Sequence, residues 1–189
     1  MEKSNKKAVK RFPLAQLCRI AIMAALLCVA SPWSIPVGPI PISLATFVVY
    51  LIGIVLGWVD GTIAVAVYLL LGAIGLPVFS GGAGGFQKLI GATGGYLIGY
   101  LPCVALTGWM ADRFPYKRLW TVVGMVFGTI VLYAIGTAWF MVQSRRELLE
   151  SLSLCVVPFL AGDAAKIAVC ALIGIPLRKS TDKLIGKTA

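Results

Sequence analysis

Long apolar runs separated by short polar or proline-rich breaks dominate the chain. A helix that crosses a membrane needs about 20 mostly apolar residues. Four prolines between residues 32 and 41 interrupt the first long uncharged run, and FSGGAGGFQ (79–87) is too rich in glycine for a stable helix. We therefore expect an all-α polytopic membrane protein whose six transmembrane helices form one bundle. The expected spans are about 14–31, 42–58, 61–76, 89–111, 119–142 and 158–177.

No linker separates a second unit, so residues 1–189 are expected to form a single six-helix membrane domain with a basic cytoplasmic tail at 1–12. The alternative for the first run is a cleaved signal peptide, because basic residues precede it. That run is about 18 residues long, and Cys28-Val29-Ala30 is a poor cleavage site. We expect the run to be retained as a span.

The lysines and arginines near the helix ends predict the orientation of the bundle. Twelve of them fall on one side of the expected spans and three on the other. The twelve are Lys3, Lys6, Lys7, Lys10, Arg11, Arg113, Lys117, Arg118, Arg178, Lys179, Lys183 and Lys187, and the three are Lys88, Arg145 and Arg146. Because cytoplasmic loops carry the excess of basic residues, both termini are expected to be cytoplasmic (N-in/C-in). The Gly-rich stretch then faces outward.

Composition agrees with a membrane protein and narrows the chemistry. Hydrophobic residues make up 59% of the 189 residues and charged residues 13%, against about 25% charged in soluble domains. The chain has no His, which removes most catalytic triads and zinc sites. The odd count of five Cys suits reduced thiols better than a disulfide framework. The net charge of +10 sits at the helix ends, so we expect lipid rather than nucleic acid as the partner of these charges.

Asp163 and Lys166 are the charges placed well inside an expected span. Each would cost roughly 2.5–3.5 kcal/mol at the bilayer centre. If the helix starts at Pro158, its rise of about 1.5 Å per residue places Asp163 about 8 Å and Lys166 about 12 Å below that start. The two residues are then one turn apart on one face of the helix. One interpretation is a structural ion pair. The other is a polar pocket, open to the outside, for a small solute.

Rows of small residues at four-residue spacing predict where helices approach closely. Gly53, Gly57 and Gly61 form one row, and Gly124 with Gly128 another, both expected to pack inside the bundle. The row Gly91, Gly95 and Gly99 continues from the Gly-rich stretch. Its upper part is expected to let a ligand approach the backbone.

Two segments carry a family resemblance. GLPVFSGGAGGFQKLIGATGGYLIGY (75–100) and PFLAGDAAK (158–166) strongly resemble the BioY family of biotin transporters, which are substrate-binding S components of energy-coupling factor (ECF) transporters. Ala92 and Ala161 stand where the family pattern has other residues, Pro in the first case, and both changes affect backbone stiffness rather than a polar contact. The resemblance implies a binding protein without an ATPase of its own, and the chain indeed has no G-x-x-x-x-G-K-[ST] motif.

The resemblance implies biotin as substrate and a multi-pass location in the cell membrane of a prokaryote. It also implies as partners a transmembrane T component and two ATP-binding-cassette ATPases, with no cofactor, metal or catalytic residue. The expected substrate-binding residues are Phe79, Gly84, Gln87, Gly91, Thr93, Tyr96, Asp163 and Lys166. Gly81, Gly82, Gly85 and Phe86 are expected to form a gating loop that moves together with Phe79. Ala21 and Ala25, an A-x-x-x-A pair, are expected to dock onto the energising partner.

Two other functions compete with a binding protein. An enzyme would need a nucleophile and a base; Ser80 beside Gly81 has no His to activate it, which leaves Lys166. A channel would use SGGAGG as a re-entrant filter, but the inner halves of the spans carry almost no polar residues. The residues alone do not decide which end of biotin would meet Asp163 or Lys166.

Overall fold

The computed structural model describes residues 14–35 and 40–184. The basic tail at 1–12, Lys187, and Pro36 and Pro39 lie outside the described residues. The described chain is predominantly helical. Its elements are α1 (Leu14–Ala30), β1 (Ser34–Ile35), β2 (Ile42–Ser43), α2 (Ala45–Ala73), η1 (Ser80–Gly82), α3 (Phe86–Ile90), α4 (Gly94–Arg113), α5 (Arg118–Ser144), α6 (Leu148–Cys155) and α7 (Val157–Leu184).

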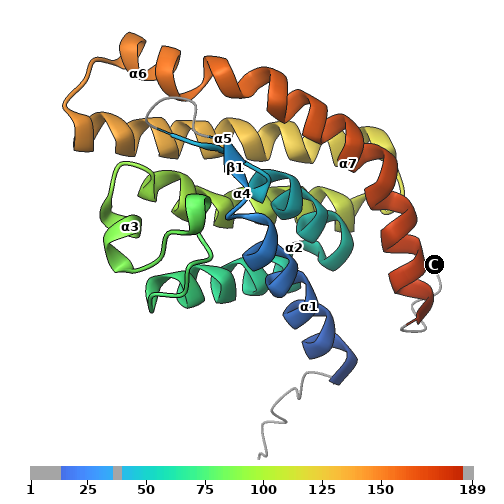
Figure 1. Ribbon diagram of the computed structural model, residues 1–189. Helices are drawn as coiled ribbons and strands as arrows, with labels where there is room; N and C mark the ends of the chain where they lie inside the picture. The colour runs from blue at the N-terminus through green and yellow to red at the C-terminus, as the bar shows by residue number, and fades with distance from the viewer. Residues whose placement is uncertain (1–13, 36–39, 185–189) are drawn as a thin grey trace, which may run out of the picture.

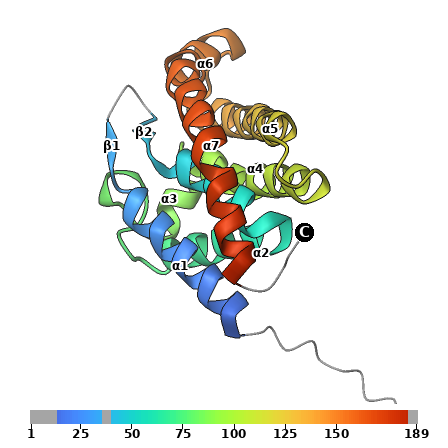
Figure 2. The same ribbon diagram turned by 90° about the vertical axis from the view of Figure 1, so that its right-hand side faces the viewer.

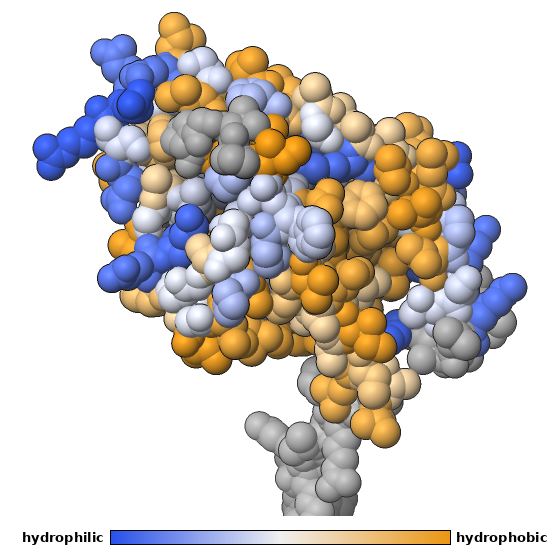
Figure 3. Space-filling model, in the orientation of Figure 1, coloured by the Kyte–Doolittle hydropathy of each residue, from blue (hydrophilic) through white to orange (hydrophobic). Residues whose placement is uncertain are grey.

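Three of the described helices, α2, α5 and α7, are long and apolar enough to cross a membrane, and α1 is a shorter apolar helix of 17 residues. Large apolar side chains stay exposed along their outer faces, among them Phe127 and Ile130 on α5 and Leu160 and Leu172 on α7. Figure 3 shows this hydrophobic surface along α1 and α7, with polar residues gathered at the end that carries α3 and α6. Water-exposed surfaces of this kind are rare, so the solvent of these faces is lipid. The chain is therefore a membrane protein.

A two-stranded ribbon and a short helix lie in segments where the sequence predicted only loops. β1 and β2 pair antiparallel as a two-stranded ribbon between α1 and α2, with Ser34 opposite Ser43. The loop expected at 143–157 contains the short helix α6. Figures 1 and 2 place this ribbon, α3 and α6 toward one end of the bundle, and the α4–α5 connection with the last turns of α7 toward the other.

The expected spans 42–58 and 61–76 fall on the two parts of α2, which is broken at Gly57. Gly57 has φ +80°, a conformation that favours glycine, and a Cβ there would overlap the Asp112 carboxylate. Asp112 accepts the Trp58 N–H (3.0 Å), and Arg178 donates to the Ile54 carbonyl (3.1 Å) and to Asp112 (2.7 Å). Because a helix break in a membrane frees backbone groups that lipid cannot satisfy, these two side chains take over the freed groups.

The glycine rows fix how the central helices pack. A Cβ on Gly53 would lie 2.9 Å from the Cβ of Thr107, so α2 and α4 approach almost backbone to backbone. A Cβ on Gly128 would lie 2.9 Å from the Cys103 carbonyl oxygen, which brings α5 equally close to α4. Gly95 and Gly99 also face α5, at Trp139 and Leu132. These rows therefore pack helices, as expected for α2 and α5, and on α4 Gly95 and Gly99 serve the same purpose.

Candidate functional site

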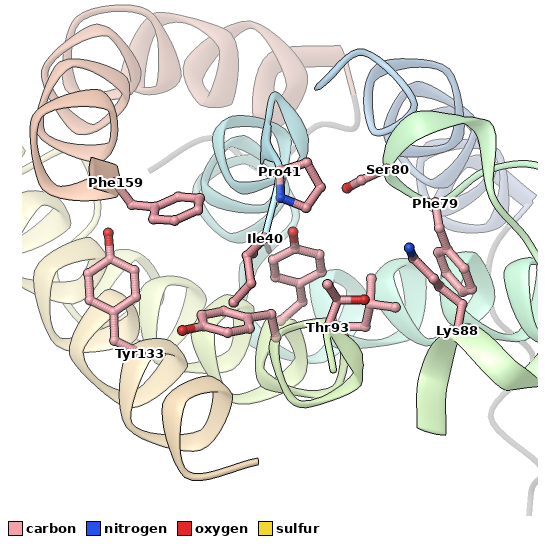
Figure 4. Close-up of a pocket in the computed structure, with 11 residues that line it drawn as sticks. Ile40, Pro41, Phe79, Ser80, Lys88, Thr93, Tyr133 and Phe159 are labelled. Atoms are coloured by element: carbon pink, nitrogen blue, oxygen red, sulfur yellow. The ribbon is translucent and has the colours of Figure 1, made fainter. Parts of the chain in front are cut away.

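A mainly apolar cavity opens among the Gly-rich segment, the start of α4, α5 and the start of α7. Its cavity volume is about 50 Å³. Its lining comes from the β1–β2 connection, the 79–88 segment, α4, α5 and α7: Ile40, Pro41, Phe79, Ser80, Lys88, Thr93, Tyr96, Leu97, Tyr100, Tyr133 and Phe159. Figure 4 shows Tyr133 and Phe159 at one end of the cavity and Phe79, Ser80 and Lys88 at the other.

The first two turns of α4 supply one wall of the cavity. Thr93, Tyr96, Leu97 and Tyr100 are spaced three, four and seven residues apart, which places them on one helix face. The Tyr96 hydroxyl is within 3.2 Å of the Thr137 hydroxyl and donates to the Cys155 carbonyl (3.3 Å), so its ring is held against α5 and the end of α6. A ring fixed in this way offers an apolar face to a ligand without losing side-chain entropy on binding.

Phe79 anchors the Gly-rich segment. Its ring is fully buried, packs edge-on against Tyr68 at 5.5 Å between centroids, and lies where a Cβ on Gly72 would be. The Phe79 N–H donates to the Ala83 carbonyl (2.9 Å), which closes the intervening turn. Phe79 was expected from the sequence to swing with the loop, but in this structure it is part of the core and lines the cavity from a fixed position.

The residues between Phe79 and Phe86 form the exposed part of this segment. Gly81, Gly82 and Gly85 have φ of +75°, +71° and +95°, and nothing lies within 4 Å of a Cβ added to any of them. Gly84 differs, because a Cβ there would overlap the backbone of Leu76. Phe86 is 64% exposed and does not line the cavity. The three open glycines give this turn backbone freedom, and Gly84 ties it to the end of α2.

Asp163 and Lys166 form an ion pair of 2.9 Å between α7 residues one turn apart. The carboxylate also accepts hydrogen bonds from Tyr133 (2.6 Å) and Thr46 (3.2 Å). The ammonium donates to the Ser43 carbonyl and to the Thr46 hydroxyl, both at 2.8 Å. The side chains are only 5% and 13% exposed. Burial of two charges is tolerable where geometry and extra hydrogen bonds satisfy both, and here they do.

The pair lies behind the cavity wall, because neither residue lines it. Tyr133 connects the two, since its ring lines the cavity and its hydroxyl donates to Asp163. The structural ion pair and the polar pocket considered from the sequence are thus adjacent features, joined by one tyrosine. Any polar group of a ligand at this end of the cavity would meet a hydroxyl whose partner is a carboxylate.

Of the expected substrate-binding residues, Phe79, Thr93 and Tyr96 line the cavity. Gly84, Gln87 and Gly91 do not. Gln87 is exposed on α3, and Gly91 ends that helix with its carbonyl accepting the Trp139 indole N–H (3.0 Å). Ala21 and Ala25 are exposed on α1, on the face opposite the buried Ile20, Ala24 and Leu27.

Several lining residues carried no clear signal in the sequence. Lys88 is the charged side chain among those that line the cavity, and it follows directly after the Gly-rich stretch. A lysine beside a glycine-rich turn could have been singled out for that reason. Tyr133 could not, because only the packing of α5 against α7 brings it to Asp163, 30 residues away in the chain.

The fold and the cavity define a membrane-embedded helical protein with a mainly apolar pocket at one end of its bundle. Comparison with known proteins makes this specific. The BioY family model matches residues 2–183, and the chain belongs to the BioY family. It is accordingly a transport protein and not an enzyme.

The relatives agree over nearly the full chain. The biotin transporter BioY of Thermotoga maritima is 40% identical over 88% of this chain and 97% of its own length. The probable biotin transporter BioY of Pyrococcus horikoshii is 32% identical over 86% and 95%. A crystal structure of the S component for biotin from an ECF-type ABC transporter superposes with a TM-score of 0.81 at 33% identity, covering 87% of this chain and 90% of that one.

The ion pair gives a stability prediction. Asp163→Asn leaves the buried Lys166 ammonium without its counter-charge, so the free energy of unfolding should fall by about 3–5 kcal/mol. Asp163→Asn/Lys166→Met removes both charges and should recover most of that loss. Unfolding of the purified full chain in detergent measures both variants. A double variant no more stable than Asp163→Asn would contradict a charge-balanced pair.

Proposed function

We propose that this chain is the high-affinity biotin-binding S component of an ECF vitamin uptake transporter. The cavity carries the proposal, because its two ends suit the two ends of biotin. Biotin has a ureido head with two N–H donors and a carbonyl, an apolar thioether ring and a valerate carboxylate. The cavity has a cationic side chain, Lys88, at one end and the Tyr133 hydroxyl, bonded to Asp163, at the other.

We infer that the carboxylate of biotin lies at Lys88 and the ureido head at the Tyr133 end. The apolar rings of Phe79, Tyr96 and Phe159 would then enclose the thioether ring and the chain. Asp163 and Lys166 set the polarity of the ureido end through Tyr133 and the Thr46 hydroxyl. The 80–86 turn, with Gly81, Gly82, Gly85 and Phe86, is the part of the wall free to close over the ligand.

The same reasoning extends to topology and place in the cell. We infer six spans with both termini in the cytoplasm of a prokaryotic cell and the cavity open to the outside, because the basic residues concentrate at the other end. A channel is disfavoured, because α2 and α5 residues such as Ile52, Ile54 and Met125 are apolar and fully buried in the described core.

Transport needs a partner, because the chain has no ATP-binding motif. We infer docking to a transmembrane T component that couples two ATP-binding-cassette ATPases. The exposed Ala21 and Ala25 on α1 form a smooth strip on which a partner helix can approach closely.

The test of the proposed function uses biotin and biotin amide, whose side chain is uncharged. Titration calorimetry on the purified full chain should give saturable binding of one biotin, and weaker binding of the amide. Lys88→Gln should weaken biotin binding by roughly tenfold or more, the value of a charge-assisted hydrogen bond, and leave amide binding nearly unchanged. Arg145→Gln, at an exposed basic residue away from the cavity, is the matched control. No binding of biotin by the wild type would refute the function; equal loss for both ligands in Lys88→Gln would refute the orientation alone.

A second prediction concerns docking. Ala25→Trp places a bulky ring on the exposed face of α1, so uptake and co-purification with the energising partner should be lost while biotin binding by the isolated chain is kept. Ala24→Trp is the comparison, because Ala24 is 3% exposed and its replacement should overpack the bundle and reduce folded yield. Normal uptake by Ala25→Trp would contradict docking through this face.

A further inference from the structure

A second apolar recess lies between α4 and α5, toward the end of the molecule away from the biotin cavity. Its volume is about 240 Å³, and it is lined by Leu106, Trp109, Met110, Gly124 and Phe127. Trp109 is 51% exposed and Phe127 56% exposed, so the recess opens on the outer surface of the bundle. We call it the α4–α5 groove. Gly124 creates its depth, because a Cβ there would press on the Met110 Cβ at 2.7 Å.

The groove leads to a basic loop. Arg113 follows Trp109 and Met110 by four and three residues on α4, and Lys117 precedes Trp120 by three and Gly124 by seven on α5. Arg113 therefore lies on the α4 face that lines the groove, and Lys117 stands directly before the first turn of α5. Phe114 and Trp120 stack at 4.3 Å between ring centroids across the α4–α5 connection, which holds the two helix ends together.

The charge at this mouth is not neutralised locally. Arg113, Lys117 and Arg118 are exposed, and none of the ion pairs found among residues 14–35 and 40–184 involves them. The nearby carboxylates of Asp112 and Asp182 already lie against Arg178, at 2.7 and 3.7 Å. An apolar groove in the lipid-facing surface that ends at two free cations matches a molecule with an acyl chain and an anionic head.

The recess at the opposite end of the bundle shows that this pattern is not general to the molecule. It lies on α6 and the start of α7, and its polar lining includes the carboxylates of Glu147 and Glu150 beside Leu149, Leu152 and Val157. Carboxylates at a mouth disfavour an anionic headgroup by like-charge repulsion. Glu150 there is paired with Arg146, and the lining of that recess contains carboxylates rather than cations.

We propose that the α4–α5 groove binds one anionic phospholipid, with an acyl chain along Trp109 and Phe127 and the phosphate between Arg113 and Lys117. Each basic side chain near a headgroup surface is worth roughly fivefold in affinity for anionic lipid. The site is separate from the biotin cavity and shares no lining residue with it.

The test is native mass spectrometry of the purified full chain in detergent, supplied with dioleoyl phosphatidylglycerol or with dioleoyl phosphatidylcholine. We expect one tightly retained phosphatidylglycerol and roughly tenfold weaker retention of phosphatidylcholine. Arg113→Gln/Lys117→Gln should weaken retention of phosphatidylglycerol by roughly tenfold or more, to the level of phosphatidylcholine. Arg145→Gln/Lys183→Gln makes the same charge change outside the groove and should retain phosphatidylglycerol as the wild type does. Melting temperatures, expected to be unchanged, show that both double variants are folded.

Three results would overturn the proposal. Equal retention of the two lipids by the wild type would show that the groove does not recognise an anionic headgroup. Retention of phosphatidylglycerol by Arg113→Gln/Lys117→Gln at the wild-type level would place the lipid elsewhere. Displacement of the lipid by millimolar inorganic phosphate would show an ion site to which the groove contributes nothing.

Discussion

A charge in a lipid-surrounded bundle must find its partners inside the protein, and the Asp163–Lys166 pair meets that constraint with groups from three other segments. The ammonium donates to the Ser43 carbonyl on β2 and to Thr46 in the first turn of α2, and the carboxylate accepts from Thr46 and from Tyr133 on α5. α7 is thereby fixed against α2 and α5 at the end of the bundle that holds the cavity. The cavity walls supplied by Tyr133 and Phe159 are placed by that attachment.

At the other end of the bundle, Asp112 and Arg178 supply hydrogen-bond partners to backbone groups of α2. The break at Gly57 frees polar groups of α2, and Asp112 and Arg178 satisfy the Trp58 N–H and the Ile54 carbonyl. Charged side chains near both ends of α7 therefore bond to α2: Lys166 to Thr46 and Arg178 to the Ile54 carbonyl. Between them the helices pack by apolar contact and by glycines, and the exposed 80–86 turn beside the cavity contains the glycines with open space around them.

Features set by the spacing of residues within one segment could be predicted from the sequence. Contacts between segments that are distant in the chain could not. The helical class, the shared face of Asp163 and Lys166 and the packing role of Gly53 and Gly128 follow from local spacing, and the structure contains them. The burial of Phe79 against Tyr68 and the bond from Tyr133 to Asp163 join distant segments and leave no local pattern. Lys88 is an intermediate case. Its position next to the glycines can be seen in the sequence, but only the structure shows that its side chain lines the cavity.

The central claim is that the cavity between the Gly-rich segment, α4, α5 and α7 holds biotin. Ser80→Trp tests it most directly, because Ser80 lines the cavity and an indole there would occupy the ligand's volume. Leu76→Trp is the matched control, since Leu76 is 43% exposed and outside the lining. Calorimetric titration with biotin should show binding by the wild type and by Leu76→Trp, and at least a hundredfold weaker binding by a folded Ser80→Trp variant. Biotin affinity at the wild-type level in Ser80→Trp would contradict the account.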